Sequence, residues 1–296
     1  MSKMLCVCIP TCNRQNMLKN LLISIINIID NNKFNFKINI IVVDNDSNGS
    51  SFDCVKKLDK EYIYYFIEKT KGYSNVRNKC LKEAKSIGAD YLIFIDDDEY
   101  PINNWIQKFY NKMLEGYDII FGPVFPEFKN FNPPKWIIKN KFFIKKTDNY
   151  EKYPLMYTSN TFIKLKSINN LRFDKNFNKY GGEDVTFFKV LKNKTSCKFG
   201  WCDDAKVMEI IPEERTKIKW FLNRAYKGGI SDVITDKSNN KIKQIFFKII
   251  YNLIVGIILL PISIIGGKYT ITKVLSKLFR SFGSIYALIS IEYDFK

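Results

Sequence analysis

The segment YLIFIDDDEYP, residues Tyr91 to Pro101, decides the expected fold of this 296-residue chain. Five apolar residues, typical of a strand that is covered on both faces, run directly into four consecutive acids. Like charges at close range repel by about 1 kcal/mol in water, and by several times more in a partly buried cleft. The segment therefore predicts a buried strand whose end brings carboxylates close together, an unfavourable arrangement that indicates a functional site.

Strand and helix signals alternate along the first 125 residues around this segment. Apolar runs predict strands, and segments with helical periodicity predict helices. The strands are expected at 4–9, 38–43, 62–67, 91–95 and 117–122, and the helices at 16–28, 74–88 and 105–114. This order favours an α/β fold with a mostly parallel central sheet flanked by helices. In such sheets, ligands bind at the carboxyl ends of the strands.

The pattern changes twice further along the chain. From Pro123 to Asp236, prolines, aromatics and Asn/Lys-rich loops predict an irregular half that packs on the sheet. Residues 236–296 predict a hydrophobic, basic, helical tail. Its uncharged run Ile249–Ile265 is at the lower limit of a membrane span, and the eight Lys/Arg against two acids in 241–296 suit an anionic lipid surface. A buried helix pair, an interfacial or re-entrant hairpin and a true span all remain open.

Composition excludes some classes of protein. The net charge of +17 fits nucleic acid, anionic lipid or the codon bias of an AT-rich genome, but the chain has no recognition-helix or RNP pattern, so no nucleic acid is expected. The first residues enter a strand directly, which predicts no signal peptide, and the seven cysteines are expected as reduced thiols. Zinc at Cys197 and Cys202 is disfavoured by their spacing and by the absence of histidine from the sequence.

Acids follow two of the predicted strands. Asp44 and Asp46 end one strand, and Asp96 to Glu99 end another. Alternate side chains of an extended chain share a face, so Asp96 and Asp98 are expected on one side and Asp97 on the other. Two converging carboxylates suit Mn²⁺ or Mg²⁺ held together with the phosphates of a nucleotide diphosphate. A solvated loop acid or a helix N-cap is the alternative for any single residue.

Five motifs in order carry a resemblance to a known family. VCIPTCNR, IVVDNDS, KGYSNVRN, YLIFIDDDE and GGEDVTFFKVL resemble glycosyltransferase family 2, whose members are inverting nucleotide-sugar transferases of the GT-A fold. The resemblance covers about residues 4 to 230. It implies a catalytic domain at 1–235, with a nucleotide-sugar-binding half at 1–125 and an acceptor-binding half at 126–235. It also implies a Mn²⁺ or Mg²⁺ cofactor and a nucleotide-diphosphate donor, with UDP expected.

The resemblance implies a set of donor-binding residues. They are Pro10, Thr11, Arg14, Asp44, Arg77, Asp96 and Asp97. Asp44 matches the acid that binds the base or ribose, and Arg77 matches a base-side contact, with a solvated helix arginine as the alternative. Asp98 matches the direct metal ligand, and Asp96 matches a second ligand or a ribose contact.

The segment GGED matches the family's catalytic acids. Asp184 would be the general base that deprotonates the acceptor hydroxyl, and Glu183 would orient the acceptor or the loop. Capping of the helix that follows is the alternative. Gly181 and Gly182 would allow positive φ or a close approach to a ligand.

Further along, the chain departs from the family pattern. Many members have a histidine that binds the metal or phosphate, whereas this sequence has Glu209 at about that place. Glu209 is either a metal ligand or a partner of Arg215. Arg215 and Arg224 are expected to contact the pyrophosphate in partial replacement of the histidine.

The expected function is transfer of a sugar from a UDP-sugar to a hydroxyl of a glycan or lipid-linked acceptor in surface polysaccharide synthesis. The tail then predicts a peripheral protein on the cytoplasmic face of the membrane. A nucleotidyltransferase that makes sugar nucleotides and an inactive scaffold subunit are the alternatives. The first loop, IPTCNRQN, lacks the Gly-rich basic signature of the former, and the intact acids argue against the latter.

Overall fold

The computed structural model describes residues 3–102, 104–152, 154–238 and 242–291, which form two compact units. The first unit comprises Met1–Glu127, Phe143–Lys175 and Glu183–Ile210, and the second comprises Phe128–Phe142, Asn176–Gly182 and Ile211–Lys296. The domain limits expected after residues 125 and 235 stay predictions. Within the expected tail, 239–241 and 292–296 lie outside the described residues.

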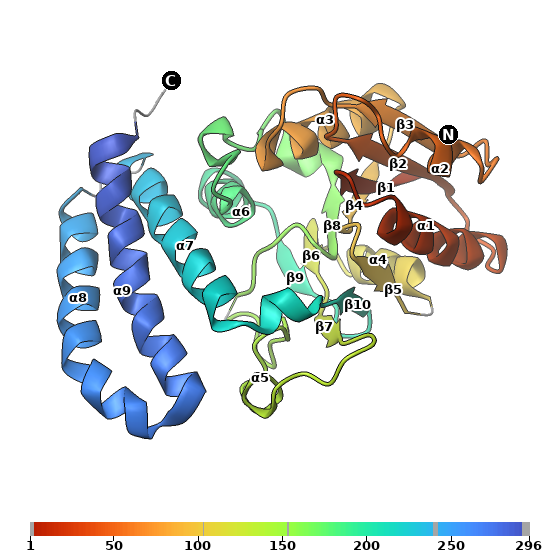
Figure 1. Cartoon of the computed structure of the whole chain (residues 1–296). Coiled ribbons are helices and arrows are strands. Elements are labelled where there is room, and N and C mark those ends of the chain that lie inside the picture. Colours follow the sequence, from red (N-terminus) through yellow and green to blue (C-terminus); the bar gives the residue numbers. More distant parts are fainter. Residues whose placement is uncertain (1–2, 103, 153, 239–241, 292–296) are drawn as a thin grey trace. The chain divides into compact units, whose positions relative to one another are not determined.

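A seven-stranded sheet of order β3-β2-β1-β4-β8-β6-β9 is the framework of the first unit (Figure 1). The strands are β1 (Met4–Thr11), β2 (Lys37–Asp44), β3 (Ile63–Ile67), β4 (Tyr91–Phe94), β6 (Ile119–Phe121), β8 (Thr161–Lys164) and β9 (Phe199–Trp201). β1 to β4 are parallel, and β8 runs antiparallel between β4 and β6. The predicted α/β fold is confirmed. β8 was not predicted, because four residues are too few to show a period.

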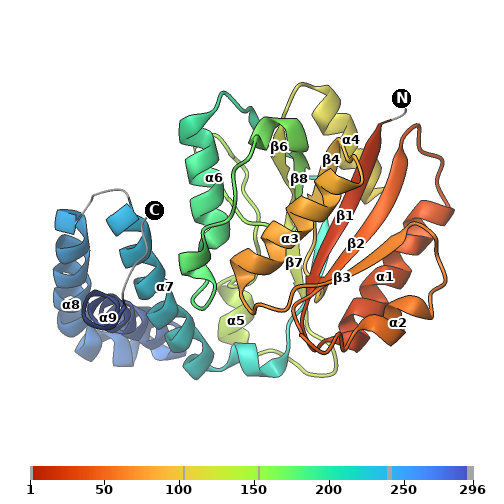
Figure 2. The same ribbon diagram turned by 90° about the horizontal axis from the view of Figure 1, so that it is seen from above.

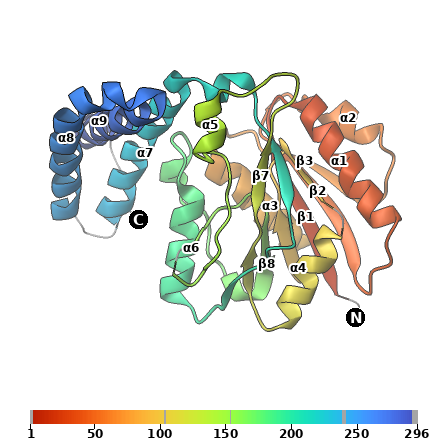
Figure 3. The same cartoon turned by 90° about the horizontal axis from the view of Figure 1, so that it is seen from below.

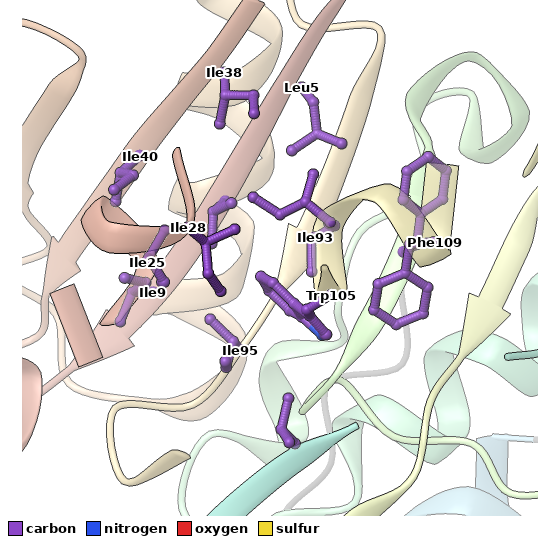
Figure 4. Packing of buried hydrophobic residues seen from close by; sticks show 14 of the residues in the cluster. Leu5, Ile9, Ile25, Ile28, Ile38, Ile40, Ile93, Ile95, Trp105 and Phe109 are labelled. Atoms are coloured by element: carbon purple, nitrogen blue, oxygen red, sulfur yellow. The ribbon is translucent and has the colours of Figure 1, made fainter. Parts of the chain in front are cut away.

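Helices cover both faces of this sheet (Figures 2 and 3). α1 (Gln15–Asp30), α2 (Phe52–Lys56) and α4 (Trp105–Leu114) pack on one face, and α3 (Tyr73–Ser86) and α6 (Glu183–Lys194) pack on the other. The division follows the alternation of each strand, since Val7 faces the first group and Cys8 the second. Figure 4 shows the first core, where Ile93 and Ile95 lie near Trp105 of α4.

A smaller sheet of order β5-β10-β7 extends the first unit. It consists of β5 (Glu99–Pro101), β7 (Val124–Glu127) and β10 (Val207–Ile210). β10 is antiparallel to β5 and parallel to β7, and this pairing sets Glu209 opposite Glu99. Two short 3₁₀ helices, Leu165–Ile168 and Lys175–Phe177, lie in the connections. The predicted irregular half therefore supplies strands to both sheets.

The second unit is helical. Its elements are α5 (Lys135–Lys139), a 3₁₀ turn (Glu213–Thr216), α7 (Ile218–Ser238), α8 (Ile242–Ile265) and α9 (Gly267–Ser290). α7 and α9 approach closely because Gly229 and Gly283 face the neighbouring backbone, where a Cβ atom would collide with a carbonyl oxygen. Ser284 fixes the crossing by donating a hydrogen bond to Gly229 O at 3.0 Å.

α8 carries the apolar run that the sequence analysis singled out. Ile245 and Ile249 are buried, whereas Phe247, Ile257 and Ile265 are 71%, 64% and 90% exposed. Lys243–Ile265 is long and apolar enough to cross a membrane by length and composition alone, with only 17% of its most apolar window buried. α8 therefore presents an apolar face that its own unit leaves uncovered.

Asn160, which precedes β8, links three parts of the first unit. It is fully buried at φ +55°, and its amide donates to Pro123 O at 2.9 Å and to Ala205 O at 2.7 Å. Its carbonyl oxygen accepts a 2.7 Å hydrogen bond from the indole of Trp105. A single side chain thus satisfies one buried donor and two buried acceptors.

We expect Asn160→Ala to lower the free energy of unfolding by about 2–4 kcal/mol, because three buried polar groups lose their partner. Urea unfolding measures the change. Asn111→Ala, at an exposed position on α4, is the matched control and should change stability by no more than about 0.5 kcal/mol. Equal stability of the two variants would contradict this role of Asn160.

Candidate active site

The two acid clusters meet at one edge of the sheet. Thr11, the last residue of β1, pairs in register with Asp44, the last residue of β2. β4 lies on the other side of β1 and ends at Phe94, and the acids follow after one further residue, Ile95. The prediction that both clusters follow parallel strands at the same edge is confirmed.

The acids after β4 form a tight turn. The amide of Glu99 donates to Asp96 O, and the amide of Asp96 donates to the carboxylate Oε2 of Glu99, both at 3.1 Å. Arg14 donates to Asp97 Oδ1 at 2.8 Å and to Asp98 Oδ2 at 3.2 Å. The expectation that Asp97 points away from Asp98 is therefore wrong. Strict alternation holds only in extended chain, and here the chain turns.

Thr11 and Arg14 hold the middle of this turn. The hydroxyl of Thr11 donates to Asp97 Oδ2 at 2.8 Å, and Pro10 precedes Thr11 in β1. Burial raises the pKa of Asp97 to about 6, against the lowering effect of Arg14. Of the residues predicted to form one site, Thr11, Arg14 and Asp97 are thus brought together, and Pro10 is adjacent to Thr11 in the chain.

Asp44 is fully buried and takes three hydrogen bonds. Its Oδ1 accepts from the amide of Asp46, and its Oδ2 accepts from the amide of Ser51 and the hydroxyl of Tyr65. These contacts shape the loop after β2. Asp44 therefore has a structural use of its own, and its contact with a base or ribose stays a prediction.

Arg77 joins the acid turn to the GGED segment. Its Nη1 donates to Glu183 Oε1 at 2.5 Å, and its Nη2 lies 3.5 Å from Asp96 Oδ1. Arg77 is only 8% exposed, so the alternative of a solvated helix arginine is wrong. Burial raises the pKa of Asp96, and the guanidinium of Arg77 works against that rise.

Glu183 and Asp184 begin α6. Glu183 is buried, whereas Asp184 is half-buried and accepts a 2.7 Å hydrogen bond from the amide of Val185. Both acids lie in the first turn, where the helix dipole favours negative charge. Gly181 and Gly182, with φ of +82° and +95°, form the turn before the helix.

Lys145 is a site residue that the sequence analysis missed. Its ammonium donates to the hydroxyl of Ser159 at 2.9 Å and lies 3.7 Å from Glu209 Oε2. Burial raises the pKa of Glu99 well above its ordinary value, Asp96 and Glu209 raise it further, and Lys145 opposes them. Lys145 stands in a Lys-rich stretch, KFFIKKTD, where no motif distinguishes it from its neighbours.

Glu209 lies opposite Glu99 on β10 and pairs with Lys145, while the amide of the next residue, Ile210, donates to Asp98 O at 2.8 Å. The strand thus holds Glu209 beside the acid turn.

Arg215 and Arg224 belong to the second unit, where Arg224 lies over the ring of Trp220. Their contact with pyrophosphate stays a prediction.

The acid turn suits a divalent cation held partly by substrate. Within the described ranges, no three His, Cys, Asp or Glu side chains surround one point, so these residues alone give an incomplete set of ligands. Mg²⁺ usually takes one or two carboxylates plus phosphate oxygens, and Asp96, with a third of its side chain exposed, can supply one. Asp98 is buried beside Arg14 and is less accessible.

The profile of glycosyl transferase family 2 matches residues 6–171, more than half of the chain. The chain belongs to this family. The match includes β1 from its third residue, β2 to β4, the acid turn and β8, but it ends before α6 and the acids Glu183 and Asp184.

The chain is also similar in sequence to a known biosynthetic protein. The succinoglycan biosynthesis protein ExoM of Rhizobium meliloti (strain 1021) is 26% identical over an alignment of 207 residues, and the match covers 65% of this chain and 63% of ExoM. The chain thus matches less than two thirds of that relative.

Two solved structures share the fold. A mannosyltransferase of Pyrobaculum calidifontis, in complex with GDP-Man and Mn²⁺, has a TM-score of 0.64 at 12% identity and covers 97% of this chain and 88% of its own. TarS residues 1–349 of S. aureus, in complex with UDP-GlcNAc, has a TM-score of 0.54 at 14% identity, with 98% and 93% covered. The expected GT-A fold is confirmed.

We expect Lys145→Met to lower the free energy of unfolding by about 1–3 kcal/mol, because buried carboxylates lose a cation. Lys146→Met is the matched control, since Lys146 faces the exposed acids Asp148 and Asp203 rather than buried ones. Urea unfolding of both variants tests the difference. A Lys145→Met protein as stable as Lys146→Met would show that Glu99 and Glu209 do not need this cation.

Proposed function

We propose that the chain is a metal-dependent, inverting glycosyltransferase. It transfers a hexose or a related sugar from a nucleotide-diphosphate donor to an acceptor. One observation carries the proposal: the acid turn at the strand ends and the first turn of α6 share the guanidinium of Arg77. A candidate donor side and a candidate base are thereby held next to each other in one unit. Membership of glycosyl transferase family 2 supports this interpretation.

The donor binds at the carboxyl ends of β1, β2 and β4. Asp98 and Asp96 hold the cation, which when bound offsets the negative charge of the diphosphate. The proposed donor-binding set is Pro10, Thr11, Arg14, Asp44, Arg77, Asp96 and Asp97. The burial of Asp44 and Arg77 supports an indirect part for these two residues. UDP is the proposed nucleotide. The two solved structures were crystallised with UDP-GlcNAc and with GDP-Man, so the fold alone admits both nucleotides.

Asp184 is the proposed general base. It takes the proton of the acceptor hydroxyl as that oxygen forms a bond to the anomeric carbon. The bond from this carbon to the diphosphate oxygen breaks at the same time, and the diphosphate leaves with the electron pair. Because attack and departure occur on opposite faces of the sugar, the configuration inverts. Glu183, held by Arg77, keeps the start of α6 in place.

The proposed acceptor is a hydroxyl of a glycan or of a lipid-linked sugar, in the synthesis of a surface polysaccharide. The name of ExoM, a succinoglycan biosynthesis protein, supports the polysaccharide. The uncovered apolar face of α8, together with Lys243, Lys268 and Lys273 on α8 and α9, supports a peripheral position on the cytoplasmic face of the membrane.

We expect UDP-sugars with Mn²⁺ to raise the melting temperature of the protein, since a ligand stabilises the folded state by mass action. Asp98→Asn should lose this metal-dependent shift, while Asp184→Asn should keep it and lose turnover by at least about 100-fold. Asp96→Asn tests which carboxylate is the stronger ligand. Thermal shift and nucleotide release measure the two effects.

Failure of every nucleotide diphosphate to shift the wild-type protein would overturn the donor proposal. A shift with GDP-sugars alone would overturn only the choice of UDP. Pyrophosphate release from a nucleoside triphosphate would instead identify a nucleotidyltransferase. Donor binding without any turnover, over a panel of glycan and lipid-linked acceptors, would favour an inactive scaffold.

We expect the full-length protein to bind vesicles that contain anionic lipid, and a triple variant, Ile250→Gln, Ile257→Gln and Ile258→Gln, to lose at least about tenfold in affinity. These three side chains are 55%, 64% and 62% exposed on α8. Leu114→Gln, at a 66% exposed position in the first unit, is the control and should bind as the wild type does. Equal vesicle sedimentation of all three proteins would overturn the membrane proposal.

A further inference from the structure

The first half of α3 is fixed to the chain that precedes α6. Ser74 donates to Asp174 O at 2.6 Å, and Asn78 exchanges two hydrogen bonds with the backbone of Phe173, each at 2.8 Å. These residues are about 100 positions apart in the sequence. α3 therefore has a fixed position relative to the segment that leads to Glu183.

Arg77 lies between Ser74 and Asn78 on the same helix, and its guanidinium reaches in two directions. Nη1 binds Glu183 and Nη2 faces Asp96. Glu183 takes only one of the two amino groups, which leaves the other for Asp96. The acid turn and α6 thus share one rigid, planar group.

This sharing leaves hydrogen-bonding capacity unused. Arg77 and Glu183 are 8% and 4% exposed, yet Arg77 Nε and Glu183 Oε2 are buried without a hydrogen-bond partner. A bidentate pair between the two side chains would satisfy more of these atoms. Unsatisfied buried polar atoms destabilise the fold, so stability alone does not account for the arrangement.

We propose that Arg77 is a positioning residue that sets the separation between Asp96, on the donor side, and Asp184, the base next to Glu183. This inference rests on the proposed function. It also replaces the base-side contact expected from the sequence, because the side chain is buried and both amino groups face carboxylates. A shift of about 1 Å between reacting groups can lower a rate about 100-fold, so the separation matters.

The experiment compares Arg77→Met, Arg77→Lys and Glu183→Gln with wild type in the full-length protein. Titration calorimetry with UDP and Mn²⁺ gives the donor affinity, and nucleotide release gives kcat. We expect Arg77→Met to lower kcat by about 100-fold with less than threefold change in Kd, and Arg77→Lys to recover part of the loss. The double variant Arg77→Met/Glu183→Gln should lose no more than the worse single variant. Arg172→Met, at an exposed position, is the control.

If Arg77→Met raised the Kd for UDP enough to account for its whole loss of activity, the inference would be overturned in favour of a contact between Arg77 and the base. Additive losses in the double variant would also overturn it, because the two residues would then act independently. Wild type that binds donor but transfers nothing would count against the proposed function instead.

Hydrogen exchange measures the coupling without any turnover. In Arg77→Met, or in Arg77→Lys if the former does not fold, exchange should accelerate both in 94–101 and in 183–190. Acceleration in one segment alone, or the same pattern in Arg172→Met, would overturn the inference.

Discussion

Mutual repulsion among carboxylates at the end of β4 is the constraint on which the rest of the site depends. The turn Asp96–Glu99 places four acids within one turn of chain, and most of this charge is buried. Isolated buried carboxylates are strongly disfavoured, so each needs a cation or a proton. Arg14, Arg77 and Lys145 provide the cations. Arg14 and Arg77 each contact two acids, while Lys145 contacts Glu209 and opposes the rise in the pKa of Glu99.

These three cations come from separate parts of the chain. Arg14 precedes α1, Arg77 lies on α3, and Lys145 lies in the irregular half that pairs with β7. The acid turn is therefore stabilised by side chains from three separate segments of the first unit. These three cations are fewer than the acids that they contact or face, which are the four acids of the turn together with Glu183 and Glu209. That excess of negative charge suits a divalent cation.

The sequence predicted the strands well and the site only in part. Continuous apolar runs identify β1, β2 and β4, because parallel strands covered on both faces contain little else. The clusters at Asp44 and at Asp96 stand out against a basic chain. The prediction that Asp97 points away from Asp98 was wrong, because it assumed an extended backbone where the chain turns. Lys145 was missed because a lysine among many lysines carries no signal.

The α/β class, the parallel core and the edge of the sheet at which the acids gather could all be inferred from the sequence. Each of these follows from local patterns, namely apolar runs, helical periodicity and charge at strand ends. Which cation pairs with which acid depends instead on the folded arrangement. Ion pairs such as Arg77 with Glu183 join residues 106 positions apart, and the pairing depends on how α3, β4 and α6 stack. No local pattern records that stacking, because it is a property of the packed sheet and its two helical layers.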